Sequence, residues 1–265
     1  MFGFGFLESP ASIKRRREYE KEKAKEMVSR AVPFDPKMRW QKELCITAAS
    51  YNEWLAEQFL FPDLQAVPTR NAFKEPRDHP HILSPGGDMM YIHHRTFPGK
   101  TALQTLYGKN EGTVWFTGPV TFPVLLRAIS GKFALRDNNV WMSLTPMEIF
   151  TLRGGTRRAK GHVVVAGLGL GYQLMEVCRR PQVKRVTLVE IDRALMDWLL
   201  PVIRRKLGPD AKKIRRKIQG DARDVVPTLS ADVALIDIDS GYGGNYFKDC
   251  PKISYTWVWG SSEVG

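Results

Sequence analysis

The sequence predicts an α/β fold in which a doubly wound, mostly parallel sheet follows a small β-hairpin unit and a helical N-terminal region. From Gly161 onward, short runs rich in Val, Ile and Leu alternate with segments of helical periodicity, as in a parallel sheet with crossover helices. The runs are almost continuously apolar, as expected of strands buried on both faces. We therefore expect a basic, helical and extended region over 1–100, a β-rich hairpin unit over 101–158 and an α/β domain over 159–265.

The N-terminal region is marked by charge and by aromatic residues at helical spacing. Residues 12–31 predict a charged helix, which is either a solvated helix or a nucleic-acid arm. A second helix is expected over 37–61, where Trp, Leu, Tyr and Phe recur at helical spacing. Residues 62–100 are rich in Pro, Gly and His and predict an extended linker. No metal site is predicted there, because no carboxylate or cysteine lies at ligand spacing from its histidines, His79, His81, His93 and His94.

The middle of the chain predicts an antiparallel unit. Residues 112–149 alternate in polarity and contain turn chemistry near 137–139, and the stretch "FTLRGGTRRAKG" after them predicts a basic loop. Beyond it, strands are expected at 163–166, 186–189, 217–219, 233–236 and 255–259, and helices at 172–179 and 193–206.

A glycine-rich turn joins the first of these strands to its helix. Gly167, Gly169 and Gly171 allow the backbone to approach a ligand closely, and the following helix begins with free N–H groups. The dinucleotide fingerprint needs GxGxxG, but Tyr172 stands beside the third glycine, which weakens the nicotinamide interpretation. A tight structural turn remains the alternative.

Carboxylates follow the ends of the next strands. Glu190 ends the strand "VTLVEID", where it can accept both hydroxyl hydrogens of a ribose. Asp221 comes just after the third strand, where its carboxylate can accept from an adenine amino group while the backbone of Ala222 meets a ring nitrogen. Asp237 and Asp239 follow the fourth strand, beside the crevice where doubly wound sheets bind ligands. Together these positions predict a nucleoside site.

The stretches "VVVAGLGLGY", "VTLVEID", "QGDARD" and "DVALIDID", in this order, resemble the motif series of class I S-adenosylmethionine-dependent methyltransferases, and most of all their spermidine-synthase-like branch. The resemblance covers about 112–259, because "ISGKFALRDNNVWMSLTPMEI" is similar to the hairpin that precedes the nucleotide-binding domain of spermidine synthases. It implies a Rossmann-like fold and S-adenosylmethionine as cofactor. It also implies site roles: the methionine part of the ligand over Gly167, Gly169 and Gly171, the ribose on Glu190, the adenine on Asp221 and Ala222, and the reacting group before Asp237.

Three functions are open at this point. The first is methyl transfer to an unidentified acceptor, with Asp237 as base or orienter and Asp239 or Tyr242 lining the acceptor pocket. The second is aminopropyl transfer. Val165 stands where the family usually has an acid, which favours a donor without a carboxyl-amino pair, but "DNNVWMSLTPME" lacks the family's diamine-gripping residues. The third is a non-catalytic assembly protein that kept the fold. The sequence "IDSGYGGN" lacks the motif of base-amino methyltransferases.

Composition limits the setting and the partners. The formal charge of +12 predicts an anionic partner, nucleic acid or an acidic protein surface, and basic residues cluster over 204–217. The three cysteines are far apart and form no CxxC pair, which predicts a reducing, cytoplasmic setting. The start does not resemble a leader and no long apolar run follows, so the protein is not expected to cross a membrane. Only 28 residues follow Asp237, so the sheet is expected to be truncated and its last strand covered by the first ~100 residues, an oligomer or an assembly.

Overall fold

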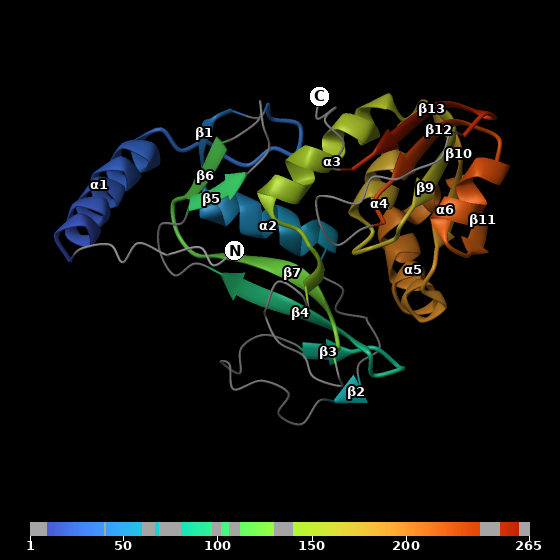
Figure 1. Ribbon diagram of the computed structural model, residues 1–265, viewed down its shortest axis with the longest axis horizontal. Coiled ribbons are helices and arrows are strands. Elements are labelled where there is room, and N and C mark those ends of the chain that lie inside the picture. The colour runs from blue at the N-terminus through green and yellow to red at the C-terminus, as the bar shows by residue number, and fades with distance from the viewer. Residues whose placement is uncertain are drawn as a thin grey trace, which may run out of the picture. The chain divides into compact units, whose positions relative to one another are not determined.

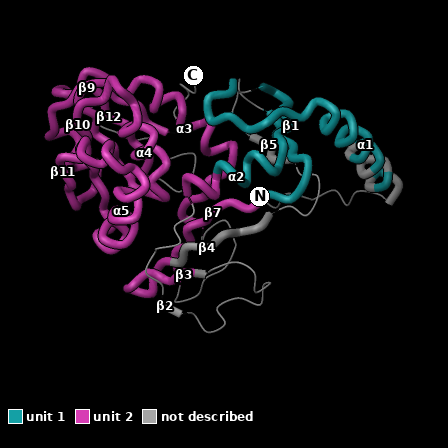
Figure 2. The backbone as a smooth tube through the Cα atoms, turned by 180° about the vertical axis from the view of Figure 1, so that it is seen from behind, with its two compact units in different colours: residues 1–54, 95–120 teal, residues 55–94, 121–265 magenta. Residues whose placement is uncertain are grey.

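The computed structural model describes residues 10–39, 41–59, 67–68, 81–96, 102–105, 112–129, 140–238 and 250–259. Its contacts divide the chain into two compact units, residues 1–54 with 95–120 and residues 55–94 with 121–265 (Figure 2). The three-part domain organisation expected from the sequence, with boundaries at residues 100 and 158, stays a prediction.

The first unit contains the helix α1 (Pro10–Ser29), which confirms the predicted charged helix, and a three-stranded sheet. The sheet has the order β1 (Glu43–Ile46), β6 (Gly112–Phe116) and β5 (Ala102–Thr105), with β1 parallel and β5 antiparallel to β6. The helix expected over 37–61 is wrong in its first half, because Leu44, Cys45 and Ile46 form the buried strand β1 and the helix α2 spans only Ala48–Phe59. Periodicity misled here because a short apolar run is compatible with either element.

The second unit contains a five-stranded sheet with the order β2 (Val67–Pro68), β3 (His81–Leu83), β4 (Met89–Thr96), β7 (Val120–Arg127) and β8 (Val140–Ser143). The antiparallel pair of β7 and β8 is the expected hairpin, whose turn near 137–139 lies outside the described residues. The extended linker expected over 62–100 is wrong where β3 and β4 pair antiparallel. This sheet therefore draws strands from both sides of residue 100.

The doubly wound part of the second unit is a five-stranded parallel sheet with the order β11-β10-β9-β12-β13 (Figure 1), which confirms the predicted α/β class. Among the described residues, β11 and β13 are its outer strands. Its elements in chain order are β9 (Gly161–Ala166), α4 (Tyr172–Arg179), β10 (Val183–Glu190), α5 (Arg193–Leu207), the 3-10 helix η2 (Gly208–Lys213), β11 (Ile214–Gln219), α6 (Ala222–Val225), the 3-10 helix η3 (Val226–Thr228), β12 (Ala231–Ile236) and β13 (Ile253–Val258).

The two faces of this sheet bury alternate residues of its central strands, β9 and β12, as a doubly wound sheet requires. On one face Val164, Ala166 and Ile236 pack with Ala222 and Val226 from the short helices after β11. The opposite face carries Leu235 and its register partner Trp257, both buried. The helix α3 (Pro146–Arg158) lies over that second face and contacts α4, which in turn contacts α5.

The basic loop expected over 150–161 is wrong, because most of this stretch belongs to α3. The helix begins with a capping box in which Thr145 accepts from the Glu148 N–H while the Glu148 carboxylate accepts from the Thr145 N–H. Its two glycines suggested a loop, yet Gly155 faces the indole of Trp257, and a Cβ there would lie 2.4 Å from the ring. Close packing of the helix against β13, rather than turn formation, explains this glycine.

Candidate nucleoside site

A cavity of about 320 Å³ opens at the carboxyl ends of the parallel strands. It lies where β9 has β10 on one side and β12 on the other, which is the switch point of strand order at which such sheets bind ligands. Of the predicted site residues, Gly167, Gly169, Glu190, Asp221, Ala222 and Asp237 line it. Gly171 does not line it: this residue stands immediately before α4, where a Cβ would lie 2.4 Å from the side chain of Ile203.

Gly167 shapes the turn between β9 and the cavity. Its φ is +92°, a region that L side chains rarely adopt, and a Cβ at this position would lie 1.9 Å from the carbonyl oxygen of Asp237. Its N–H donates to the Val189 carbonyl at 2.9 Å. The missing side chain thus lets the turn pass directly beside the end of β12, and it leaves the cavity floor as bare backbone.

Glu190 is buried at the end of β10, with 6% of its surface exposed. One carboxylate oxygen accepts from the Leu168 N–H of the glycine turn at 2.7 Å, and the other accepts from the Asp192 N–H at 2.9 Å. Each oxygen keeps a second lone pair, so the group can still accept hydroxyl hydrogens from a ligand. Burial raises the pKa of Glu190, and the backbone hydrogen bonds oppose that shift.

Asp221 and Ala222 lie at the end of β11, where Asp221 is the N-cap of α6. The Oδ1 of Asp221 accepts from the Arg223 N–H at 2.8 Å and lies 3.8 Å from the Arg223 guanidinium. These contacts hold the carboxylate at the rim of the cavity. Ala222 is buried beside it and takes part in the core on that face of the sheet.

Asp237 directly follows β12, and its N–H donates to the Ala166 carbonyl at 2.9 Å. It is half-buried and lines the cavity across the glycine turn from Glu190. Asp239 and Tyr242 lie outside the described residues, so their predicted roles are untested. The structure therefore brings three of the predicted carboxylates, those of Glu190, Asp221 and Asp237, to one cavity.

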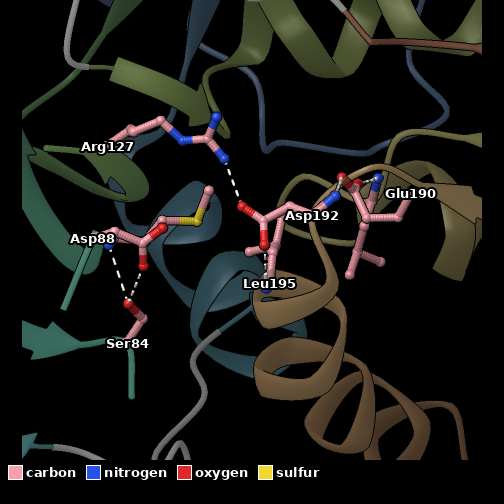
Figure 3. Close-up of polar contacts among 8 residues, drawn as sticks. Ser84, Asp88, Arg127, Glu190, Asp192 and Leu195 are labelled. Atoms are coloured by element: carbon pink, nitrogen blue, oxygen red, sulfur yellow. Dashed lines mark hydrogen bonds and ion pairs between the residues drawn. The ribbon is translucent and has the colours of Figure 1, made fainter. Parts of the chain in front are cut away.

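The antiparallel sheet contributes residues that the sequence did not reveal. Arg127 ends β7 and forms an ion pair with Asp192 at 2.6 Å (Figure 3). Its guanidinium also lies 4.0 Å from the ring of Trp141 on β8. The second oxygen of Asp192 caps α5 by accepting from the Leu195 N–H, as expected for a residue before a helix (Figure 3). Arg127, Trp141 and Met142 line the cavity. No local pattern marks them, because only the tertiary fold brings Arg127, at the end of β7, to Asp192 after β10.

Ile191 gives the cavity an apolar, accessible surface next to Glu190. It is 56% exposed, one of the few large apolar side chains of the described chain that water reaches. An exposed aliphatic side chain that lines the same cavity as the Glu190 carboxylate and the Arg127–Trp141 pair suits a flat, partly apolar ring. No alternation announces it, because the last five residues of β10 are all buried.

Metal chemistry finds no support in the described part of the chain, where no cluster of three or more His, Cys, Asp or Glu side chains could hold an ion. Likewise, no helix among the described residues combines the length and apolar character that a membrane span requires.

Comparison with known proteins gives distant structural similarities only. No family model and no curated protein matches the chain. The chain is similar to the solved structure of a precorrin-8w decarboxylase from Methanobacterium thermoautotrophicum, with 23% identity over 35% of this chain and 48% of that one and a TM-score of 0.27. It is also similar to a methyltransferase from Thiobacillus denitrificans in complex with S-adenosyl-L-homocysteine, with 22% identity over 35% of this chain and 36% of that one and a TM-score of 0.27.

A spermidine synthase from Thermotoga maritima matches more of the chain, with 13% identity over 63% of this chain and 56% of that one and a TM-score of 0.31. The chain spans less than half the length of the first two structures. The solved structures similar to this chain thus include S-adenosylmethionine-dependent methyltransferases and spermidine synthases. These TM-scores are low, so only the cavity of this chain bears on its function.

Proposed function

We propose that the protein is an S-adenosylmethionine-dependent methyltransferase whose acceptor is not yet identified. The observation that carries the proposal is the convergence of the glycine turn and three strand-end carboxylates on one cavity at the switch point of the sheet. A nucleoside presents two ribose hydroxyls and an amino-substituted ring, and Glu190 and Asp221 offer the matching acceptors. The bare backbone at Gly167 would accommodate the amino-acid part of the ligand.

The bound cofactor would supply a methyl group already activated by the positive charge of its sulfonium. The protein then has to position the acceptor in line with that group, and positioning can supply most of the catalysis. Asp237 lies at the end of β12 beside the glycine turn, where its carboxylate can orient an acceptor N–H or O–H and take its proton.

The test is calorimetric titration with S-adenosylmethionine, S-adenosylhomocysteine, decarboxylated S-adenosylmethionine and NADH. We expect the first two to bind, and binding of NADH alone or of no nucleoside would refute the proposal. Preference for the decarboxylated donor, with aminopropyl transfer to putrescine, would establish the alternative transfer. Nucleoside binding without methyl transfer to any of a panel of acceptors would favour the non-catalytic assembly protein.

A further inference from the structure

The amino ends of the parallel strands lie at the edge of the sheet opposite the cofactor cavity, and this edge is basic. The cations come from the end of α3, the segments before β9, β11 and β13, and the first residues of β10 and β11. They are Arg157, Lys160, Lys184, Arg185, Lys212, Arg215, Arg216 and Lys252, and all of them are exposed. We call this set the basic edge.

Some basic residues near this edge have a structural role instead. Arg180 donates to the carbonyls of Ala159 and Arg157 at 3.1 and 2.8 Å, which satisfies the end of α3. Lys213 donates to the carbonyls of Cys178 and Arg180 at the end of α4 and pairs with Asp210 at 2.9 Å. Arg180 and Lys213 thus satisfy the carbonyl groups at the ends of α3 and α4, so the cations of the basic edge are not needed for that purpose.

The basic edge itself is uncompensated within the described part of the chain. No described residue gives its side chains a hydrogen bond or a salt bridge. The nearest acids by position are Asp210, which pairs with Lys213, and Asp232, whose carboxylate accepts from the His162 N–H at 2.7 Å. Eight like charges gathered on one edge repel each other, and a bound polyanion would relieve that repulsion.

A hollow of about 410 Å³ lies at one end of the basic edge, lined by Arg157, Arg158, Lys160 and Tyr255 among others. The guanidinium of Arg158 lies 4.7 Å from the Tyr255 ring. An anionic oxygen in this hollow would be attracted by Arg157, Arg158 and Lys160 together.

We propose that the basic edge binds the sugar-phosphate backbone of a nucleic acid, with Tyr255 and Arg158 at one end of the path. Five strands about 4.8 Å apart make an edge about 19 Å long, along which one nucleic-acid strand presents about five or six phosphates. An anionic membrane is the weaker candidate, because peripheral membrane surfaces combine cations with exposed large apolar groups. The described residues of that kind are Tyr19, Val32, Ile129 and Ile191, and none belongs to this edge.

The experiment is fluorescence anisotropy with a labelled oligonucleotide longer than the edge, single-stranded or duplex, at several salt concentrations. We expect a combined Lys184→Gln, Arg185→Gln, Arg215→Gln and Arg216→Gln variant to bind at least tenfold more weakly. The slope of log affinity against log salt should fall by about 3, since each lost phosphate contact removes ~0.7 to 0.9.

The matched control removes the same charge from exposed residues of the first unit: Lys21→Gln, Lys25→Gln, Arg39→Gln and Lys42→Gln. It should keep the affinity and the slope. A second variant, Arg157→Gln with Lys160→Gln and Lys252→Gln, tests the other end of the edge in case the first set fails to fold.

Three results would overturn the proposal: no binding by the unchanged protein in low salt, equal loss in the control variant, or binding to vesicles with anionic lipid but not to either oligonucleotide. Affinity for S-adenosylhomocysteine, measured on the same samples, should be unchanged by these variants. Because the basic edge and the cofactor cavity lie at opposite ends of the strands, failure of one proposal leaves the other standing.

Discussion

Replacing Glu190 by Gln should weaken nucleoside binding more than it weakens the fold. The carboxylate accepts from Leu168 and Asp192 and has one further lone pair on each oxygen for a ribose hydroxyl. An amide has only one acceptor oxygen, so at least one hydrogen bond from ligand to a charged acceptor is lost. Such a bond contributes about 1.5–3 kcal/mol, which corresponds to roughly tenfold to a hundredfold in the dissociation constant.

The same change also affects stability. The new NH₂ group must face either the Leu168 N–H or the Asp192 N–H, and a buried N–H without an acceptor costs about 1–3 kcal/mol. Removal of a buried charge offsets part of that cost, because burial disfavours the ionised form of Glu190. We therefore expect a lower unfolding midpoint in urea, but a protein that is still folded at the temperature of the titration.

The matched control is Glu148→Gln. Glu148 is the other glutamate whose pKa is raised by burial, and it accepts from Ser143 and Thr145 at the start of α3 without lining the cavity. Calorimetric titration with S-adenosylhomocysteine should give a weakened affinity for Glu190→Gln and an unchanged one for Glu148→Gln. Equal affinities in all the proteins, or equal losses in both variants, would refute the assignment of the ribose to Glu190.

Three further outcomes are expected. Gly167→Ala should lower the unfolding free energy in urea by at least about 2 kcal/mol, since its Cβ would meet the Asp237 carbonyl at a positive φ, and a milder loss would contradict this geometry. Gly155→Ala should cost about 1–3 kcal/mol despite the better helix propensity of Ala, and Trp257→Leu in the same chain should recover part of it in a double-mutant cycle. Affinity for S-adenosylhomocysteine should be full while Glu190 is ionised and should fall as the pH is lowered through the pKa of Glu190. Because burial raises that pKa, the loss of affinity should begin at a higher pH than for an exposed glutamate. An affinity that stays constant down to strongly acidic pH would argue against the role of Glu190.

The alternating half of the fold was predictable because each strand and helix there is defined by local pattern. The helix expected over 172–179 has those bounds in the structure, and every expected strand from 163 to 259 lies on an observed one to within a few residues. Buried parallel strands are marked by unbroken Val, Ile and Leu, and their helices by a regular apolar face. The chain order then fixes which ends of the strands share an edge.

The N-terminal half was less predictable, because its short strands depend on distant partners. The strand β1 is four residues long and pairs with β6 seventy positions away, so its apolar run could equally have extended the helix α2. Likewise α3 contains two glycines, and only contact with Trp257 on a later strand explains why one of them is needed.

The sequence alone determined the parallel sheet, the glycine turn and the carboxylates at the strand ends, because strand direction and local turn chemistry place those groups at one edge. Tertiary structure alone decided which residues of other elements join them at the cavity and which cations gather at the opposite edge of the sheet. Arg127 and Trp141 reach the cavity through the antiparallel sheet, and the cations of the basic edge gather from segments far apart in the chain. The physical reason is that spatial proximity between separate elements is set by packing, and no local pattern records it.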